Sequence, residues 1–160
     1  RPVVKNPLIT REGYESLKEE LDYLWRVERR EVTAKVTWAA GLGDRSENAD
    51  YQYNKKRLRE IDRRVRYLRK RLDELKVVDY HPDQAGKIYF GAHVVLVDDD
   101  GREMKFRIVG VDEIYGKQGC VSINSPAARA CLGKDIDDEV EIATPDGRKL
   151  WYVESFSYNR

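Results

Sequence analysis

The sequence has few of the residues that usually build metal sites or covalent catalytic sites. Its 160 residues include two cysteines and two histidines, and no Ser-His-Asp or Cys-His arrangement stands out. It contains no glycine-rich loop of the phosphate-cradling kind. The spacing of Cys120 and Cys131 fits no common zinc or disulfide pattern, so we expect two reduced thiols in a cytoplasmic protein. His81 and His93 are isolated, and we interpret them as loop and strand residues.

Long apolar runs are also missing. No stretch approaches the roughly 20 apolar residues that a membrane helix needs, so we expect no membrane partner. Charged residues are abundant at 37%, and the net charge of +1 conceals an asymmetry. Residues 1–76 hold 20 basic and 14 acidic residues, whereas residues 77–160 hold 10 and 15. The two halves should therefore meet different partners.

The first half has the apolar period of two long helices. Thr10 is a plausible N-cap for the first helix, after a loose arm over residues 1–9, and Gly41 and Gly43 should end it. Its apolar stripe is interrupted at Glu28 and comprises Tyr14, Leu17, Leu21, Leu24, Val32, Val36, Ala39 and Ala40. The second helix carries a heptad seam at Leu58, Ile61, Val65, Leu68, Leu72 and Leu75.

The two stripes can be matched residue by residue as an antiparallel pair. Leu21 then faces Leu68, Leu24 faces Val65, and the turn falls between Asp44 and Arg45. We therefore predict a coiled-coil hairpin over residues 1–76, with arms roughly 45 Å long. A coiled-coil hairpin this thin has little reason to be long unless its far end must contact another molecule.

After Lys76 the apolar period becomes that of strands. Val77, Val78 and a turn at His81 should form a linker. Strands are expected at 88–90, 93–97, 104–109, 140–143 and 150–158, and residues 116–123 should form either a strand or a loop and a strand. A short helix should open with Ser125 as N-cap and Pro126 in the first position. We predict a small α+β domain over residues 77–160, built on an antiparallel sheet. Its aromatic residues are expected in the core, namely Tyr89, Phe90, Phe106, Trp151, Tyr152 and Phe156.

Two acidic residues at the predicted turn have two interpretations. Asp44 and Glu47 have the spacing of a capping box, which would start the second helix. Alternatively, two carboxylates at a protruding tip can share one hard cation such as Mg²⁺, with further oxygen ligands from a partner or a phosphate. Asp50, one turn further on, is a weaker candidate ligand.

The second helix also carries a basic run, with ten Lys or Arg between Lys55 and Arg71. The run can be a solvated helix surface with ion pairs across the hairpin, or it can contact nucleic-acid phosphates. We favour phosphate contact because the first helix cannot neutralise all ten charges. The candidate RNA-binding residues are Lys55, Lys56, Arg59, Arg63, Arg66 and Lys70.

Three segments closely resemble the bacterial Gre transcript-cleavage factors, and the B type of that family is the nearer match. The segments are Gly43–Tyr51 (GDRSENADY), Tyr53–Glu60 (YNKKRLRE) and Asn124–Arg129 (NSPAAR). The resemblance covers nearly the whole chain, and the tip motif is specific. It implies an N-terminal coiled-coil hairpin and a C-terminal FKBP-like domain that docks on RNA polymerase at the rim of its secondary channel.

The resemblance also implies an activity. The hairpin would enter the channel, and Asp44 and Glu47 would help to hold the second catalytic Mg²⁺, so that polymerase hydrolyses backtracked RNA near its 3′ end. The factor would not itself be an enzyme and would bind no metal stably alone. The rim contact would fall around Ser125 and Pro126, and we expect a monomer. Two alternatives stay open: a regulator that only blocks the channel, and a prolyl isomerase suggested by the FKBP-like domain.

Overall fold

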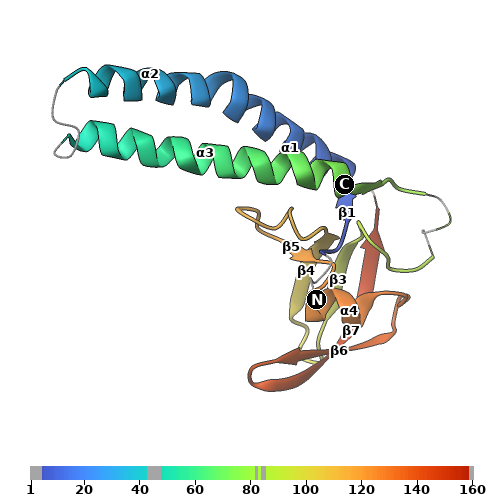
Figure 1. The fold of residues 1–160 in the computed structure, drawn as a ribbon. Coiled ribbons are helices and arrows are strands. Elements are labelled where there is room, and N and C mark those ends of the chain that lie inside the picture. The colour runs from blue at the N-terminus through green and yellow to red at the C-terminus, as the bar shows by residue number, and fades with distance from the viewer. Residues whose placement is uncertain (1–4, 43–47, 82, 84–85, 159–160) are drawn as a thin grey trace, which may run out of the picture. The chain divides into compact units, whose positions relative to one another are not determined.

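The computed structural model describes residues 5–42, 48–81, 83 and 86–158 (Figure 1). They form two compact units. We call Tyr14–Leu75 the hairpin, and we call the other unit, which joins the described residues up to Gly13 to those from Lys76 onward, the sheet domain. The start of the chain thus groups with the second half, unlike in the predicted division at residue 76. Within the described residues, no helix is both long and apolar enough to cross a membrane.

The hairpin has two helical arms that run side by side (Figure 1). The first arm consists of α1 (Arg11–Tyr23), a π-helical turn η1 (Leu24–Glu28) and α2 (Arg29–Ala40). The second arm is α3 (Ala49–Glu74). The two predicted helices are therefore confirmed, although the second begins later than a cap at Asp44 would require.

The π-helical turn explains the interruption of the apolar stripe at Glu28. The buried residues of the first arm are Leu17, Leu24, Val32 and Ala39, so one interval is eight residues long and the others are seven. The Arg29 amide donates to the Leu24 carbonyl, five residues back, which takes up one additional residue in the turn. Val32 and Ala39 consequently stay in the seam with the buried α3 residues Ile61, Val65 and Leu68.

The sheet domain is built on a five-stranded mixed sheet. Its elements are β3 (His93–Val97), β4 (Glu103–Val109), β5 (Cys120–Ser122), α4 (Pro126–Cys131), β6 (Glu139–Thr144) and β7 (Gly147–Ser157). The strand order is β5-β4-β3-β7-β6. Four strands pair antiparallel as predicted, whereas β5 pairs parallel with β4. Residues 116–123 thus contain a loop followed by the three-residue strand β5, which is the second of the two predicted possibilities.

Residues 88–90 are not a strand, contrary to the prediction. Ile88 and Phe90 are buried in the core, which accounts for the apolar pattern. The Ile88 amide donates to the Lys134 carbonyl (2.9 Å), and the Gly133 amide donates to the Ile88 carbonyl (2.7 Å). The segment is therefore held by the turn that follows α4. Phe106 and Trp151 also lie in the core, while Tyr89 is 40% exposed.

Two short strands lie where the sequence predicted the end of a loose arm and the start of a linker. β1 (Leu8–Thr10) pairs in parallel with β2 (Lys76–Val78), so that Ile9 faces Val77. Ile9 is fully buried. The residues before and after the hairpin are thus joined to each other within the sheet domain.

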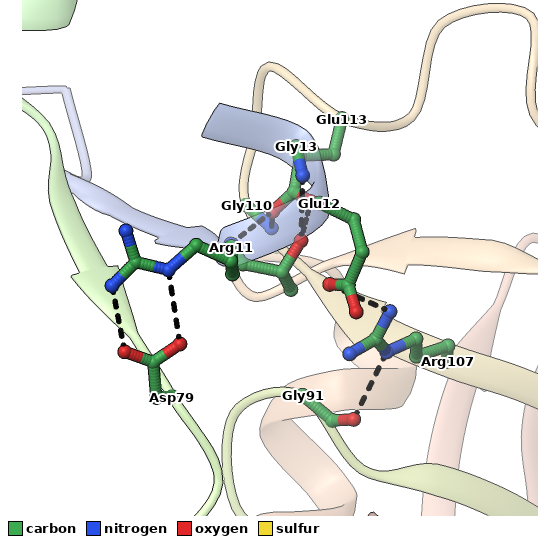
Figure 2. A network of polar contacts seen from close by, with 9 residues as sticks. Arg11, Glu12, Gly13, Asp79, Gly91, Arg107, Gly110 and Glu113 are labelled. Carbon is green, nitrogen blue, oxygen red and sulfur yellow. Dashed lines mark hydrogen bonds and ion pairs between the residues drawn. The ribbon is translucent and has the colours of Figure 1, made fainter. Parts of the chain in front are cut away.

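A buried carboxylate fixes β1 and the start of α1 (Figure 2). Glu113 is 5% exposed and accepts hydrogen bonds from the Thr10 amide (3.0 Å), the Thr10 hydroxyl and the Gly110 amide (2.7 Å). Thr10 accepts in turn from the Gly13 amide (3.0 Å), which confirms Thr10 as the N-cap. Figure 2 also shows Arg11 paired with Asp79 at 2.8 Å.

Candidate functional site

The two acidic residues of the predicted tip, Asp44 and Glu47, lie outside the described residues. The structure does describe the residues that flank them, namely Leu42 on the first arm and Asn48 before the second. Neither the metal-binding role of the two acids nor their position is therefore tested here. The flanking residues nevertheless decide how α3 begins.

Asn48, and not Asp44, is the N-cap of α3. Its side-chain oxygen accepts a hydrogen bond from the Tyr51 amide (3.1 Å), and its side-chain nitrogen donates to the Ala39 carbonyl (2.8 Å). The interpretation of Asp44 and Glu47 as the capping box that starts this helix is therefore wrong. Because Asn48 also bonds to the first arm, one side chain both starts α3 and ties the arms together beside the tip.

Asp50 is exposed in the first turn of α3, where a negative charge interacts favourably with the helix dipole. Among the residues with described positions, no group of three or more His, Cys, Asp or Glu side chains is arranged to hold a metal. Asp50 therefore has a structural explanation that needs no ion.

Ion pairs across the hairpin engage part of the basic run. Arg57 donates to both carboxylate oxygens of Glu28 (2.7 and 2.9 Å), and Arg64 does the same to Glu20 (2.7 and 2.9 Å). The hydrogen bond from Arg57 holds the pKa of Glu28 below its ordinary value. Arg71 is buried beside Glu74. Arg57 and Arg64 thus form ion pairs across the hairpin, as the solvated-surface interpretation predicted, whereas the ion pair of Arg71 with Glu74 lies within α3.

The six candidate RNA-binding residues are all exposed, and we call them the basic stripe: Lys55, Lys56, Arg59, Arg63, Arg66 and Lys70. At 3.6 residues per turn they fall within an arc of about 100° on α3, roughly opposite the seam. Lys55 donates to the Tyr51 hydroxyl (2.9 Å). No carboxylate of the described chain pairs with the stripe, so its charge faces solvent uncompensated.

The helix α4 begins as predicted. Ser125 is its N-cap and accepts from the Ala128 amide (3.2 Å), while Pro126 occupies the first turn and is exposed. The helix ends at Cys131. Ser125 therefore has a structural role, and Pro126 is accessible to a partner, but contact of either residue with polymerase stays a prediction.

Sequence patterns did not single out Trp25, which lies in η1 and is 45% exposed. The guanidinium carbons of Arg29 and Arg69 lie 5.1 and 4.5 Å from the centre of its ring. The available signal was the eight-residue interval between Leu24 and Val32. That interval indicates a local change of helix winding beside the tryptophan.

Comparison with known proteins gives the family. Residues 7–77 match the family described as "Transcription elongation factor, N-terminal", and residues 83–158 match "Transcription elongation factor, GreA/GreB, C-term". The chain belongs to the GreA/GreB family. The N-terminal match for this family begins just before β1 and ends within β2, so it spans the strands on either side of the hairpin.

Relatives within the GreA/GreB family match the chain over nearly its full length. The chain is 64% identical over 153 residues to "Transcription elongation factor GreB" of Pseudomonas putida, covering 96% of this chain and 94% of the relative. It is 59% identical over 158 residues to the protein of the same name from Vibrio vulnificus, covering 98% and 99%. The family resemblance of the tip, the basic run and the α4 segment thus extends over both units.

Proposed function

We propose that this chain is a transcription elongation factor that stimulates RNA polymerase to cleave backtracked nascent RNA and so rescues arrested complexes. The factor completes the active site of polymerase and is not itself an enzyme. The observation that carries this proposal is the N-cap at Asn48, because α3 then begins without Asp44 or Glu47 as its cap. Two acids at the end of a long arm are then available to another protein's active site.

Asp44 and Glu47 are the residues that would hold Mg²⁺, shared with polymerase. Carboxylate oxygens are the hard ligands that this ion prefers, and two of them make only a weak site alone. A second metal ion supplies charge stabilisation during phosphodiester hydrolysis. The contribution of this chain is to carry two anionic ligands into the secondary channel. The Asn48 side chain keeps the arms closed next to them.

The remaining surfaces have separate tasks in the proposal. The basic stripe holds the phosphates of the extruded RNA 3′ segment, and the sheet domain docks on the channel rim around Ser125 and Pro126. The factor acts as a cytoplasmic monomer. A regulator that only blocks the channel would need neither Asp44 nor Glu47. A prolyl isomerase would act without polymerase.

Replacing the tip acids tests the proposal directly. We expect Asp44→Asn and Glu47→Gln to keep the helical content and polymerase binding of the parent but to lose most of its cleavage stimulation. Extra Mg²⁺ should partly restore activity, because a weakened site fills at higher ion concentration. RNA cleavage in a stalled polymerase complex, measured across a Mg²⁺ titration, gives the result. Cleavage equal to that of the parent at limiting Mg²⁺ would refute the metal role of the two acids. A parent chain that stimulates no cleavage at all would instead be a channel blocker.

A second experiment tests the stripe. Arg59→Gln, Arg63→Gln and Arg66→Gln together should weaken crosslinking to the RNA 3′ segment and flatten the salt dependence of binding, by about 0.7 in slope for each lost phosphate contact. A matched control removes three exposed lysines of the sheet domain, Lys87, Lys105 and Lys117. If both triple variants lower the slope equally, the effect is one of net charge and the stripe is only a solvated surface.

The docking surface is tested in the full chain by Pro126→Ala. Pro126 is exposed, and alanine is a good helix former, so α4 should persist. We expect weaker binding to polymerase with an unchanged melting temperature. A variant that folds and binds polymerase normally removes Pro126 from the interface.

A further inference from the structure

Trp25 lines at least three hollows on the hairpin. One of them, of about 650 Å³, has a mixed lining that includes Glu15, Glu19 and Asp22 as well as Lys18, Arg26 and Arg69. The other two are more basic. The first, of about 490 Å³, lies between the two arms and is lined by Trp25 together with Arg29, Arg66, Arg69 and Lys70. The second, of about 650 Å³, follows the first arm alone. Its lining is Trp25, Arg26, Arg29, Arg30, Thr33 and Ala34, which includes no carboxylate.

Most of the cations around Trp25 are not neutralised. Arg29 is paired with Asp62 (2.8 Å), and Arg26 is paired with Asp22 (2.7 Å). By contrast, no ion pair to a described carboxylate engages Arg30, Arg66, Arg69 or Lys70. Asp62 and Asp73 also line the hollow between the arms, but they cannot balance this charge. On the side of these two basic hollows, the surroundings of Trp25 therefore attract an anion.

The backbone holds Trp25 in a fixed place. Trp25 follows Leu24, which is buried in the seam and accepts the π-helical hydrogen bond from the Arg29 amide. Two guanidinium groups lie near the ring, and cations near an aromatic face are attracted by its quadrupole. The 45% of Trp25 that stays exposed is thus presented by a π-helical turn, a feature that is frequent at functional sites.

An exposed aromatic ring surrounded by cations matches the chemistry of single-stranded RNA. Bases stack on aromatic side chains, while arginine and lysine bind the phosphates on either side. An acidic protein surface would pair with the arginines but would offer no aromatic group to stack on the exposed part of Trp25. A duplex keeps its bases stacked within the helix and cannot offer one to Trp25. Arg66 and Lys70 belong both to the stripe and to the hollow, so the two surfaces are continuous.

We propose that Trp25 is a base-stacking site for single-stranded RNA, with Arg30, Arg66, Arg69 and Lys70 binding the neighbouring phosphates. The inference rests on the proposed RNA binding and extends it from the stripe on α3 to the first arm. It also adds an interaction of a different kind, because stacking depends on the base and not on charge. Trp25 would hold the extruded RNA at a set position along the arm.

The test measures binding of the full chain to fluorescently labelled single-stranded RNA of about 12 nucleotides over a range of salt concentrations. Trp25→Leu removes the aromatic face without removing charge. Its affinity should fall about five- to a hundredfold, the range found for loss of one base–aromatic stack, with an unchanged salt slope. Trp25→Phe keeps a ring and should lose much less. Trp38→Leu removes another exposed tryptophan of the same arm and should change affinity less than about twofold.

An RNA of the same length with abasic positions separates stacking from positioning of the arginines. Trp25→Leu should bind this oligomer as tightly as the parent does. Equal losses on both oligomers would overturn the inference, because Trp25 would then only support Arg29 and Arg69. Unchanged affinity for ordinary RNA, or an equal loss in Trp38→Leu, would overturn it as well. If the Arg59, Arg63 and Arg66 variant weakens RNA binding while Trp25→Leu does not, only this inference fails. If neither has an effect, RNA binding by the hairpin fails with it.

Discussion

In the hairpin, buried side chains form one narrow row along each arm, whereas in the sheet domain they form one large cluster. The row includes Leu24, Val32, Val65 and Leu68. The cluster draws on β3, β4, β6, β7 and α4. The hairpin adds charged side chains that pair across its arms, such as Glu28 with Arg57. A narrow seam leaves most of each helix at the surface, where the hairpin carries its candidate functional residues. The sheet domain instead uses most of its apolar residues for its own stability.

Equal truncations in the two cores should have the largest effects. Leu68 and Leu96 are both fully buried, so Leu68→Ala and Leu96→Ala should each cost about 2–5 kcal/mol in free energy of unfolding. Hydrogen exchange by mass spectrometry should show faster exchange in α3 for the first variant and in β3 for the second. Faster exchange in both units for either variant would mean that the hairpin and the sheet domain unfold together. The two units would then not have separate stabilities.

A smaller effect is expected at the strands that flank the hairpin. A Cβ at Gly110 would lie 2.2 Å from the Leu8 carbonyl oxygen and 3.0 Å from a Glu113 oxygen. Gly110→Ala should therefore cost about 1–3 kcal/mol by overpacking. Exchange should accelerate first in β1 and β2. Gly86→Ala is the control, because nothing lies within 4 Å of its added Cβ. Equal stability of the two variants would show that the backbone around Leu8 shifts at little cost to accommodate the added methyl group.

Acid should weaken the ion pairs that distinguish the hairpin. The pKa of Glu28 is lowered from 4.5, chiefly by its hydrogen bond from Arg57. A lowered pKa in the folded state means that the pair's contribution is fully present above pH 4.5 and is lost as pH falls through the lower folded value. Glu28→Gln should therefore be less stable than the parent at pH 7, by about 1 kcal/mol or less for this partly exposed pair. The difference should shrink in acid. Thermal unfolding of α3 followed from pH 7 to pH 3 measures it, and a constant difference would contradict the sign.

The smallest expected effect is a difference in the rate at which the two cysteines of the sheet domain react with an alkylating reagent. Cys131 is fully buried, and burial raises the pKa of its thiol to about 11. At pH 8 an alkylating reagent should modify the half-buried Cys120 well before Cys131. Leu96→Ala should accelerate modification of Cys131, and Leu68→Ala should not. Rapid modification of Cys131 in the parent would show that the cluster opens easily.

The sequence predicts those parts of the fold that follow a period over many residues. The heptad seam of α3, the cap at Ser125 and the strands β3, β4, β6 and β7 were all predicted, whereas the predicted turn between Asp44 and Arg45 lies outside the described residues. The loose-arm prediction for the first residues fails because β1 and β2 are three residues long each, and their partners are far apart in the chain. Neither strand has enough residues to show an alternation.

The sequence predicted residues of the candidate site, but it did not predict how their side chains contact one another. The exposed stripe was found because charged residues off a seam must face solvent. The capping box at Asp44 was one of two interpretations left open, although Asn48 is as good an N-cap by residue type and lies four residues later. The hydrogen bond from the Tyr51 amide to the Asn48 side chain identifies Asn48 as the cap. Trp25 was missed because its importance depends on Arg69, which reaches it from the other arm.

The parallel pairing of β1 with β2 gives the hairpin a topological role. Parallel neighbours cannot be joined by a tight turn and need a crossover connection. Here the whole hairpin is that connection, since the chain enters it after Thr10 and leaves it at Lys76. Antiparallel helices that leave and return at the same place can gain or lose matching turns without moving either strand. The length of the hairpin can therefore change in steps of about 5 Å, by one helical turn in each arm, without a change in the sheet domain.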